Sequence, residues 1–388
     1  MRLHDPHKKN SAVTTKVTCA IIFWLFSLSW LFWFQSDVLA VAQHVLSGGM
    51  TSYNRVAGAV LITFVLQMLQ LLVFMAIRLQ RRTHALTYFP SMMLLALLTD
   101  ISPNISRETV GLSYWLWLAP LLLLLWAVVV WFARQLLPFG QDNLPSGFFS
   151  RRVWINMLLM VLMMVGVAGL GNTDAVFHYR AHAEVALNKG LYDEALKTGQ
   201  QSLETDRNLT MLRAYALARK GQLAERLFEY PIAGRGADLL PLPDSRSRLL
   251  LLPKDSLFML CGARPVAITT SSRYLTLLQQ DSLATKAAID YQLCGLLIDR
   301  KIDAFARTLL LCYKIDDHLP RHYREALTLY CHLRSHPVVV YHNAVMETDW
   351  KDFQKLEKAY PLKSERKGMV FERYRGSYWY YYFYGFQG

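Results

Sequence analysis

The chain has 388 residues, of which 53% are hydrophobic, and its formal net charge is +13 at pH 7. This charge is spread over both halves of the chain without a long basic run, so the composition excludes a nucleic-acid-binding protein. Apolar residues dominate the first 170 positions, which is typical of a membrane domain and excludes a wholly soluble chain.

Five blocks in residues 1–170 carry almost no charge, and each is close to the length that crosses a bilayer as a helix. We expect a transmembrane domain with spans at about 17–35, 56–77, 84–100, 112–133 and 153–170. The third block is shorter and contains Pro90, so the sequence leaves open whether it crosses fully. The first block exceeds the apolar length of a signal peptide and lacks a following cleavage pattern, so we expect it to be retained.

The loops between the blocks predict the orientation. Five crossings place ten basic residues on one side of the membrane: Arg2, Lys8, Lys9, Lys16, Arg78, Arg81, Arg82, Arg134, Arg151 and Arg152. Only Arg55 and Arg107 fall on the other side. The positive-inside rule then places the N-terminus in the cytoplasm and residues 171–388 outside it. Four crossings would remove this bias, so the number of spans and the orientation depend on the same residues.

Residues 171–388 begin with a pattern typical of paired helices. Gly190 can end a helix in a left-handed conformation, and Ala195 is small enough to let two helices approach closely. The segment from 179 to 208 resembles the second half of a tetratricopeptide repeat at Gly190, Tyr192, Ala195, Ser202, Leu203, Asp206 and Asn208. Two positions depart from that family, because Arg207 replaces the usual Pro and Ala183 replaces the earlier Gly.

The remaining helical patterns extend this repeat-like region. A second, degenerate pair runs from Leu209 through Gly221 to Tyr230, a third runs from Leu283 to Tyr313, and a helix follows over Arg321–Leu333. We therefore expect an all-α fold, with about five transmembrane helices followed by a tetratricopeptide-like solenoid with repeats at 176–230 and 281–333. The residues expected to pack the repeats are Gly190, Tyr192, Ala195, Leu203 and Gly221.

Two further regions complete the expected domain. Residues 231–272 contain five Pro with the flanking Pro231 included, so we expect an extended connection with one short helix, packed through Leu249–Leu252. Residues 338–388 predict helices over 338–347 and 350–359 and end in an aromatic run, Tyr378–Phe386. We expect this run to cap the domain, while an anchor in the membrane interface is the alternative.

No motif in the chain predicts catalysis, a cofactor or a metal. A Gly-rich phosphate loop, a Gly-x-Ser-x-Gly elbow and a His-Glu-x-x-His pair are all missing from the sequence. A loose group of residues has no established zinc spacing and is interpreted as exposed helix histidines with a nearby thiol: His318, His322, Cys331, His332, His336 and His342. Met157, Met160 and Met164 share one face of the fifth span, where helix packing explains them better than Cu(I).

The polar residues leave two smaller questions. Gln67 and Gln70 share a face of the second span, where we expect a hydrogen bond to a neighbouring helix. Cys261, Cys294, Cys312 and Cys331 lie in the expected exported part, where both disulfides and buried free thiols are compatible with the sequence.

The order of parts resembles a group of bacterial inner-membrane proteins with a multi-span N-terminal region and an exported tetratricopeptide-repeat-like tail. The segments that carry this resemblance are Gly221–Pro231, Leu319–Leu327 and Ser377–Tyr382. It implies a multi-pass protein of the bacterial inner membrane, in contact with lipid, with a periplasmic C-terminal domain. At the repeat domain we expect a protein or peptide partner. The leading hypothesis is a membrane-anchored interaction scaffold. The alternative is a degenerate or subunit-dependent membrane enzyme that acts on a lipid-linked substrate.

Overall fold

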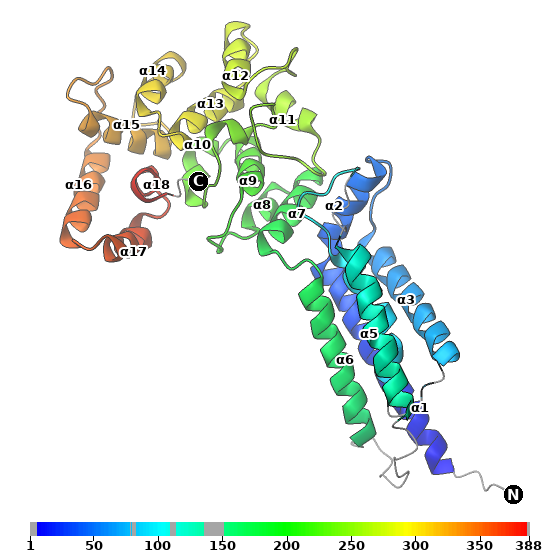
Figure 1. The fold of residues 1–388 in the computed structure, drawn as a ribbon. Coiled ribbons are helices and arrows are strands. Elements are labelled where there is room, and N and C mark those ends of the chain that lie inside the picture. Colours follow the sequence, from blue (N-terminus) through cyan, green and yellow to red (C-terminus); the bar gives the residue numbers. More distant parts are fainter. Residues whose placement is uncertain (1–5, 78, 80–82, 109–113, 136–150, 386–388) are drawn as a thin grey trace, which may run out of the picture. The chain divides into compact units, whose positions relative to one another are not determined.

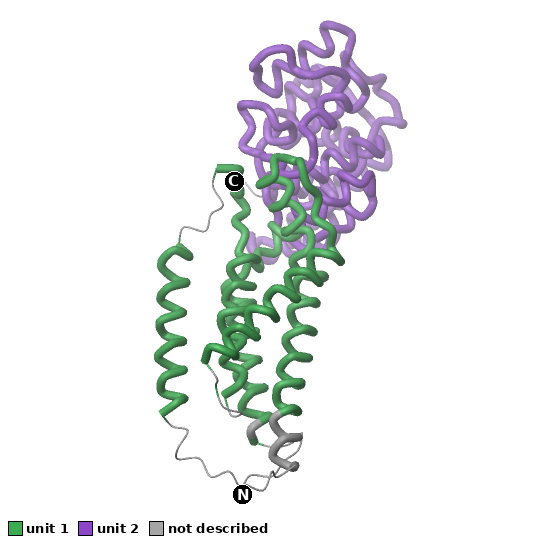
Figure 2. Tube along the Cα trace, turned by 90° about the vertical axis from the view of Figure 1, so that its right-hand side faces the viewer, with its two compact units in different colours: residues 1–178 green, residues 179–388 purple. Residues whose placement is uncertain are grey.

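The computed structural model describes residues 6–77, 79, 83–108, 114–135 and 151–385. Over these residues the chain is all-α, with eighteen α-helices connected by turns and short 3₁₀ or π-helical segments (Figure 1). Two compact units divide the chain, residues 1–178 and residues 179–388 (Figure 2). The sequence pattern placed this boundary at residue 170, whereas α7 (Ala175–Asn188) carries the chain from one unit into the other.

Four helical segments of the first unit are long and apolar enough to cross a membrane. They are Val13–Phe34, Arg55–Ile77, Trp115–Gln135 and Val153–Leu170, with 18 to 23 residues each. The first combines α1 (Pro6–Ser29) with a π-helical turn, η1 (Trp30–Phe34); the others lie in α3 (Arg55–Ile77), α5 (Trp115–Gln135) and α6 (Arg151–Leu170). The chain is therefore a multi-pass membrane protein. A further helix, α2 (Ser36–Ser47), occupies the first loop, where the sequence pattern gave no helix.

The third apolar block forms a shorter helix than the other four. It begins as a 3₁₀ segment, η2 (His84–Tyr88), and continues as α4 (Phe89–Thr99). Pro90 lies in the first turn of α4, where a missing N–H leaves no helical hydrogen bond unmade. Tyr88, Met92 and Leu95 are buried at 1%, 2% and 0% exposure, so this short helix lies at the centre of the bundle rather than at its edge.

Contacts at the start of η2 and at the end of α4 show which parts of the other helices lie beside this short helical segment. At its start, His84 packs against Phe74 of α3, and the backbone N–H of Ala85 donates to Asn156 Oδ1 of α6 at 2.7 Å. At its end, Thr99 Oγ1 accepts from the Trp30 indole at 3.2 Å, and the Thr99 carbonyl accepts from the Asn172 N–H at 3.1 Å. The helix thus covers most of the length of α6.

The first two helix pairs of the second unit have short second helices. After α7 come α8 (Tyr192–Lys197), α9 (Arg207–Arg219) and α10 (Leu223–Arg226), which ends in a 3₁₀ turn, η4 (Leu227–Glu229). The expected helix after Gly190 stops at Lys197 because Thr198 is extended and Gly199 has a φ of 61°. These pairs are therefore not regular tetratricopeptide repeats, whose two helices are of similar length.

A buried arginine stabilises the turn that ends α8. Arg213 of α9 is 2% exposed and donates to the carbonyls of Thr198 and Gly199 at 3.2 and 3.1 Å. Its guanidinium also lies over the Tyr230 ring, 5.3 Å from the centroid. Burial lowers the pKa of Arg213 to about 10. The side chain thus satisfies helix-terminal carbonyls that would otherwise be buried without a donor.

The Pro-rich connection is tied to α7 by the Glu184 carboxylate and by the Arg180 guanidinium. Glu184 is 0% exposed and accepts from the consecutive backbone N–H groups of residues 250, 251 and 252, with 3.0 Å to Leu250 and 3.2 Å to Leu252. Arg180, one turn earlier, donates to the carbonyl of Arg248 at 2.7 Å. The connection has two short helices, η5 (Gly236–Leu239) and α11 (Lys254–Cys261), and residues 249–252 lie beside α7.

The rest of the second unit is more regular. α12 (Ser271–Gln280) is followed by α13 (Lys286–Ile298) and α14 (Ile302–Cys312), which form the third expected pair, and by α15, whose bounds Arg321–Leu333 match the expected ones. The two helices expected over 338–359 are one helix, α16 (Ala344–Ala359), after an irregular segment. The chain then continues through α17 (Lys363–Tyr374) to α18 (Tyr378–Tyr384), which contains most of the aromatic run.

Candidate functional site

Four of the five expected repeat-packing residues lie at helix turns or in the core of the second unit. Gly190 and Gly221 have φ values of 75° and 66°, and an added Cβ at either position would meet no neighbour, so backbone conformation alone favours glycine there. Ala195 is 2% exposed, and the Tyr192 hydroxyl accepts from Arg219 Nε at 2.9 Å. Leu203 is 66% exposed, so its expected packing role is wrong, because the chain has already left the helix at Thr198.

The most elaborate polar arrangement of the second unit surrounds Glu325 of α15. One carboxylate oxygen accepts from Arg321 Nε at 2.9 Å; the other accepts from His322 Nδ1 at 3.0 Å and from the Tyr378 backbone N–H at 2.7 Å. His322 Nε2 accepts from the Phe228 N–H at 3.3 Å, which leaves Nδ1 as the donor and makes the imidazole neutral. We call Phe228, His322, Glu325 and Tyr378 the Glu325 clasp.

The Glu325 clasp joins three parts of the chain, namely η4, α15 and α18. His322 and Glu325 are 0% and 3% exposed, so the expectation that His322 is an exposed helix residue is wrong. Burial alone would raise the pKa of Glu325, but the hydrogen bond from His322, the charge of Arg321 and the Tyr378 N–H together hold this pKa below its ordinary value. The carboxylate therefore stays ionised and acts as an acceptor for donors from two other segments.

The aromatic run packs inside the second unit. Tyr378 and Trp379 are 0% and 2% exposed, and the Trp379 indole donates to the Glu325 carbonyl at 2.7 Å. The Phe228 ring lies 5.1 Å from the Tyr378 ring and 4.9 Å from the Tyr381 ring. Arg300, with a φ of 58°, donates to the carbonyls of Tyr381 and Gly385. The first residues of the run are therefore buried in the second unit, while Phe383 is 42% exposed.

A second buried carboxylate, Asp290 of α13, carries two tyrosine hydroxyls. Tyr313 and Tyr323 both donate to Oδ1, at 2.7 and 2.8 Å, and the Tyr323 hydroxyl also lies 3.8 Å from the Cys294 sulfur. Burial raises the pKa of Asp290, and the two hydroxyl donors only partly oppose this shift. The group joins α13, the end of α14 and α15, so its donors and acceptors are used in packing.

The cysteines and surface histidines do not come together as a metal site in the described part of the chain. All five cysteines are free thiols, with Cys261 and Cys294 buried and Cys312 and Cys331 partly buried. His332 Nε2 donates to a carboxylate oxygen of Glu347 at 2.9 Å, and the His332 ring stacks on Trp350. His342 lies 3.9 Å from the same carboxylate. These residues stabilise the start of α16 against α15.

Polar residues of the membrane unit form one chain of hydrogen bonds. Gln67 donates to Gln70 at 2.7 Å, Gln70 donates to Thr87 at 2.8 Å, and Thr87 donates to the His84 carbonyl. The expectation of a hydrogen bond to a neighbouring helix is confirmed for Gln70, and that neighbour is η2. This series of hydrogen bonds fixes the buried segment η2–α4 to α3 inside the bundle.

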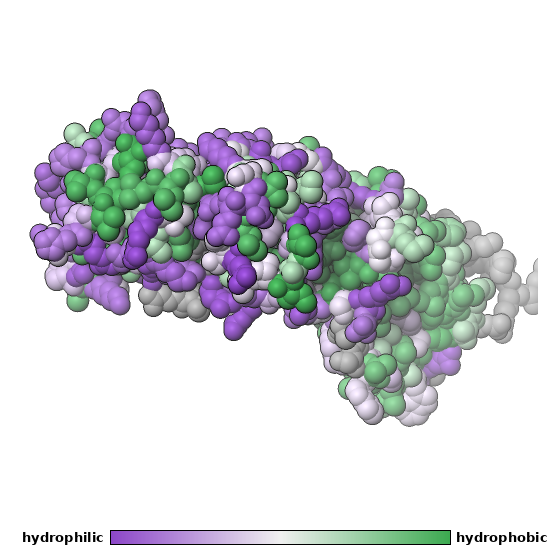
Figure 3. Space-filling view, turned by 90° about the horizontal axis from the view of Figure 1, so that it is seen from above, coloured by the Kyte–Doolittle hydropathy of each residue, from purple (hydrophilic) through white to green (hydrophobic). Residues whose placement is uncertain are grey.

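Large apolar side chains remain exposed on the second unit, and Figure 3 shows apolar patches on its otherwise hydrophilic face. Val266 and Ile268 are 104% and 92% exposed in the loop between α11 and α12. The loop is held at its base, because the Tyr274 hydroxyl donates to the Ala263 carbonyl and Gly262 packs against the Leu283 carbonyl. We call Met259, Val266, Ile268 and Leu283, all more than half exposed, the apolar loop surface.

Part of this second unit is similar to the model of one protein family. Residues 266–385 match the model of a family described as "Family of unknown function (DUF6057)". The match begins in the exposed loop and includes α12 to α18, so it contains Glu325, His322 and the aromatic helix. No curated protein and no solved structure matches the chain.

Sequence reasoning missed the Glu325 clasp although the residues gave a local signal. Arg321 and His322 lie four and three positions before Glu325, a spacing that brings all three to one helix face. Burial of that face could not be read from the sequence, because it depends on Phe228 and Tyr378 from distant segments. The Glu184 contacts were missed for the same reason, since their acceptor and donors are separated by 66 to 68 positions.

Proposed function

We propose that this protein is a membrane-anchored interaction scaffold whose second unit binds a protein or peptide partner outside the cytoplasm. The supporting observation is the apolar loop surface, where Val266 and Ile268 project fully into solvent from a loop with a fixed base. Fully exposed apolar residues on a held backbone are the kind of anchor that a partner pocket buries. By contrast, the His322, Glu325 and Asp290 side chains bond within the unit.

We further propose five crossings with the N-terminus in the cytoplasm. In support, the start of η2 contacts the beginning of α6, the end of α4 contacts the residues that follow α6, and both segments lie inside the bundle. Arg134 donates to the carbonyl of Ile77, and Trp115 donates to Asp100 at 2.8 Å, so α5 returns toward the end where α3 finished. Alternating directions in five helices give the arrangement in which ten basic residues fall on one side. Arg78, Arg81 and Arg82 lie outside the described residues.

A photocrosslinking amino acid placed at Ile268 tests the scaffold proposal in native membranes. We expect one discrete crosslinked partner that is absent when the same amino acid replaces the exposed Lys358. A second variant, Val266→Asp with Ile268→Asp, should reduce capture by a crosslinker at Met259 at least tenfold, because burial of a Val or Ile side chain contributes about 1.5 to 3 kcal/mol. The proposal would be contradicted if the same amount of partner were crosslinked at Ile268 and Lys358, or if the two Asp substitutions did not change the amount crosslinked at Met259.

A further inference from the structure

Four exposed arginines come together where the Pro-rich connection crosses the beginning of α9. They are Arg207, Arg235, Arg246 and Arg248, which we call the arginine patch. Arg207 is the first residue of α9, and the other three belong to the connection. The cluster is not evident in the sequence, because Arg207 is far along the chain from the three others.

Backbone contacts fix the spacing of the arginine patch. The N–H groups of Arg235 and Arg246 donate to the two oxygens of the buried Asp238 carboxylate, at 2.9 and 2.7 Å. Ser247, between Arg246 and Arg248, donates to the carbonyl of Arg207 at 3.4 Å. These bonds hold the four Cα positions around one short stretch of surface.

The side chains of the patch point away from the core. Residues 245–249 belong to no helix or turn, and Ser247 is buried at 6% exposure while Arg246 and Arg248 are exposed on either side of it. This alternation of exposure puts both arginine side chains at the surface. Arg235 uses part of its guanidinium, since it donates to the Asp244 carbonyl at 3.1 Å and lies 3.8 Å from Asp238. No acidic side chain lies within ion-pair distance of the Arg207, Arg246 or Arg248 guanidinium groups in the described residues.

Such a surface favours a ligand with several negative charges. Guanidinium groups bind phosphate oxygens in a bidentate manner, and the positive end of the α9 dipole lies at Arg207. The carboxylate nearest to the helix start, Asp206, is already occupied by the Leu209 N–H and the Asn208 amide. Closely spaced phosphate groups therefore match the patch better than a single carboxylate.

The covalent path to the membrane identifies the source of those phosphates. The carbonyl of Arg248 accepts from Arg180, which lies only ten residues after the end of α6 at Leu170. Ten residues reach at most about 34 Å even when fully extended. This length of chain allows the arginine patch to reach the headgroups, whose phosphates are present at high local concentration. We propose that the arginine patch docks the second unit on anionic phospholipid headgroups of the membrane that anchors the chain.

The full-length protein in lipid nanodiscs tests this proposal. The probe is a phosphatidylglycerol with a photoreactive headgroup, compared with a phosphatidylcholine that carries the same reactive group. Crosslinked peptides are mapped by mass spectrometry. We expect phosphatidylglycerol to label peptides that contain residues 204–208 and 243–249, and 0.5 M salt to suppress the labelling, because surface attraction of this kind is screened.

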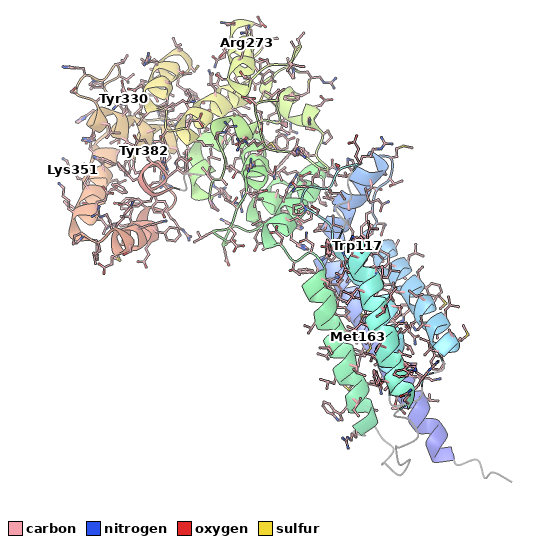
Figure 4. The ribbon with its side chains drawn as sticks, viewed as in Figure 1. Trp117, Met163, Arg273, Tyr330, Lys351 and Tyr382 are labelled. Carbon is pink, nitrogen blue, oxygen red and sulfur yellow. The ribbon has the colours of Figure 1, made fainter. Side chains whose placement is uncertain are left out.

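The variant R207Q/R246Q/R248Q supplies the discriminating comparison. Each basic residue near an anionic surface contributes roughly a fivefold factor, so loss of three should lower the labelling of these peptides roughly 100-fold. The hydrogen bonds at these three positions use backbone atoms, so the variant should keep the wild-type unfolding temperature. The matched control is K351Q/K355Q/K358Q, which removes three exposed charges from α16, where Figure 4 labels Lys351. This control should leave the labelling unchanged.

Three results would overturn the proposal. Equal labelling by the two phospholipids would show no preference for negative headgroups. An equal loss in the α16 control would show that only net charge matters. Suppression by 10 mM inorganic phosphate, at an ionic strength matched with sodium chloride, would show that the patch takes a soluble phosphate rather than a lipid.

Discussion

Replacing Glu325 with Gln should release α18 from the second unit. The side chain is 3% exposed and accepts from Arg321, His322 and Tyr378. Gln keeps one acceptor oxygen and adds an NH₂ donor, so at least one of these donors faces another donor. A tautomer change in His322 does not relieve the conflict, because its Nε2–H would then face the Phe228 N–H.

The expected loss in stability of α18 follows from one buried donor that is left without an acceptor, which costs about 1 to 3 kcal/mol. Hydrogen exchange on the full-length protein in detergent measures this locally. The protection of amides in residues 378–384 should fall roughly 5- to 150-fold, since 1.4 kcal/mol corresponds to a factor of ten. The control is Glu372→Gln on α17, an exposed position without a hydrogen-bond or ion-pair partner among the described residues, so it should change nothing. Unchanged protection in α18, or an equal fall in α3, would refute the reasoning.

The same residue predicts an acid dependence, and three further variants test other contacts. The pKa of Glu325 is held below its ordinary 4.5, so its contribution is complete above pH 4.5 and is lost as the pH falls further; α18 protection should drop there in the wild type but not in Glu325→Gln. Ala195→Trp should destabilise the second unit by about 1 to 3 kcal/mol in thermal unfolding, whereas Leu203→Trp should be neutral, and similar effects would argue against the packing shown. Asp290→Asn should leave the free energy of unfolding unchanged or raise it. The substitution removes a buried carboxylate whose pKa is raised by burial, and the amide oxygen can still accept from the two tyrosine hydroxyls. A fall of more than about 2 kcal/mol in the free energy of unfolding would contradict this. A reporter that is active only after export, fused after Gly388, should be active, and cytoplasmic activity at that position would exclude five crossings with this orientation.

The sequence predicted best where local periodicity and helix-ending residues were sufficient. The bounds of α15 were predicted without error because Pro320 begins the helix and a strong apolar periodicity follows it. The third pair was also located correctly, with its turn near Arg300. Glycine at 190 and 221 identified both left-handed turns, as expected for the residue that adopts positive φ most easily.

Predictions failed where distant residues decide the local structure. The early end of α8 at Thr198 and Gly199 was not expected, and the carbonyls of these two residues are stabilised by Arg213 from the next helix. His322 looked like a surface residue because its helix has polar neighbours, yet Phe228 and α18 cover it. The position of the Pro-rich connection could not be predicted because it depends on Glu184 of α7. This carboxylate accepts from consecutive backbone N–H groups of the connection.

The aromatic cage around Phe228 has a consequence for how the chain folds during synthesis. Phe228 contacts His322 at 5.0 Å and Tyr378 at 5.1 Å between ring centroids, and Tyr378 follows it by about 150 residues. At the roughly 5 to 20 residues per second of translation, Phe228 waits about 10 to 30 s for its last neighbour. The early helices α9 and α10 therefore spend that time with an uncovered aromatic surface. Their protection from aggregation during this interval must come from outside the second unit, and the ribosome, a translocation channel or a chaperone is the kind of cover that this delay requires.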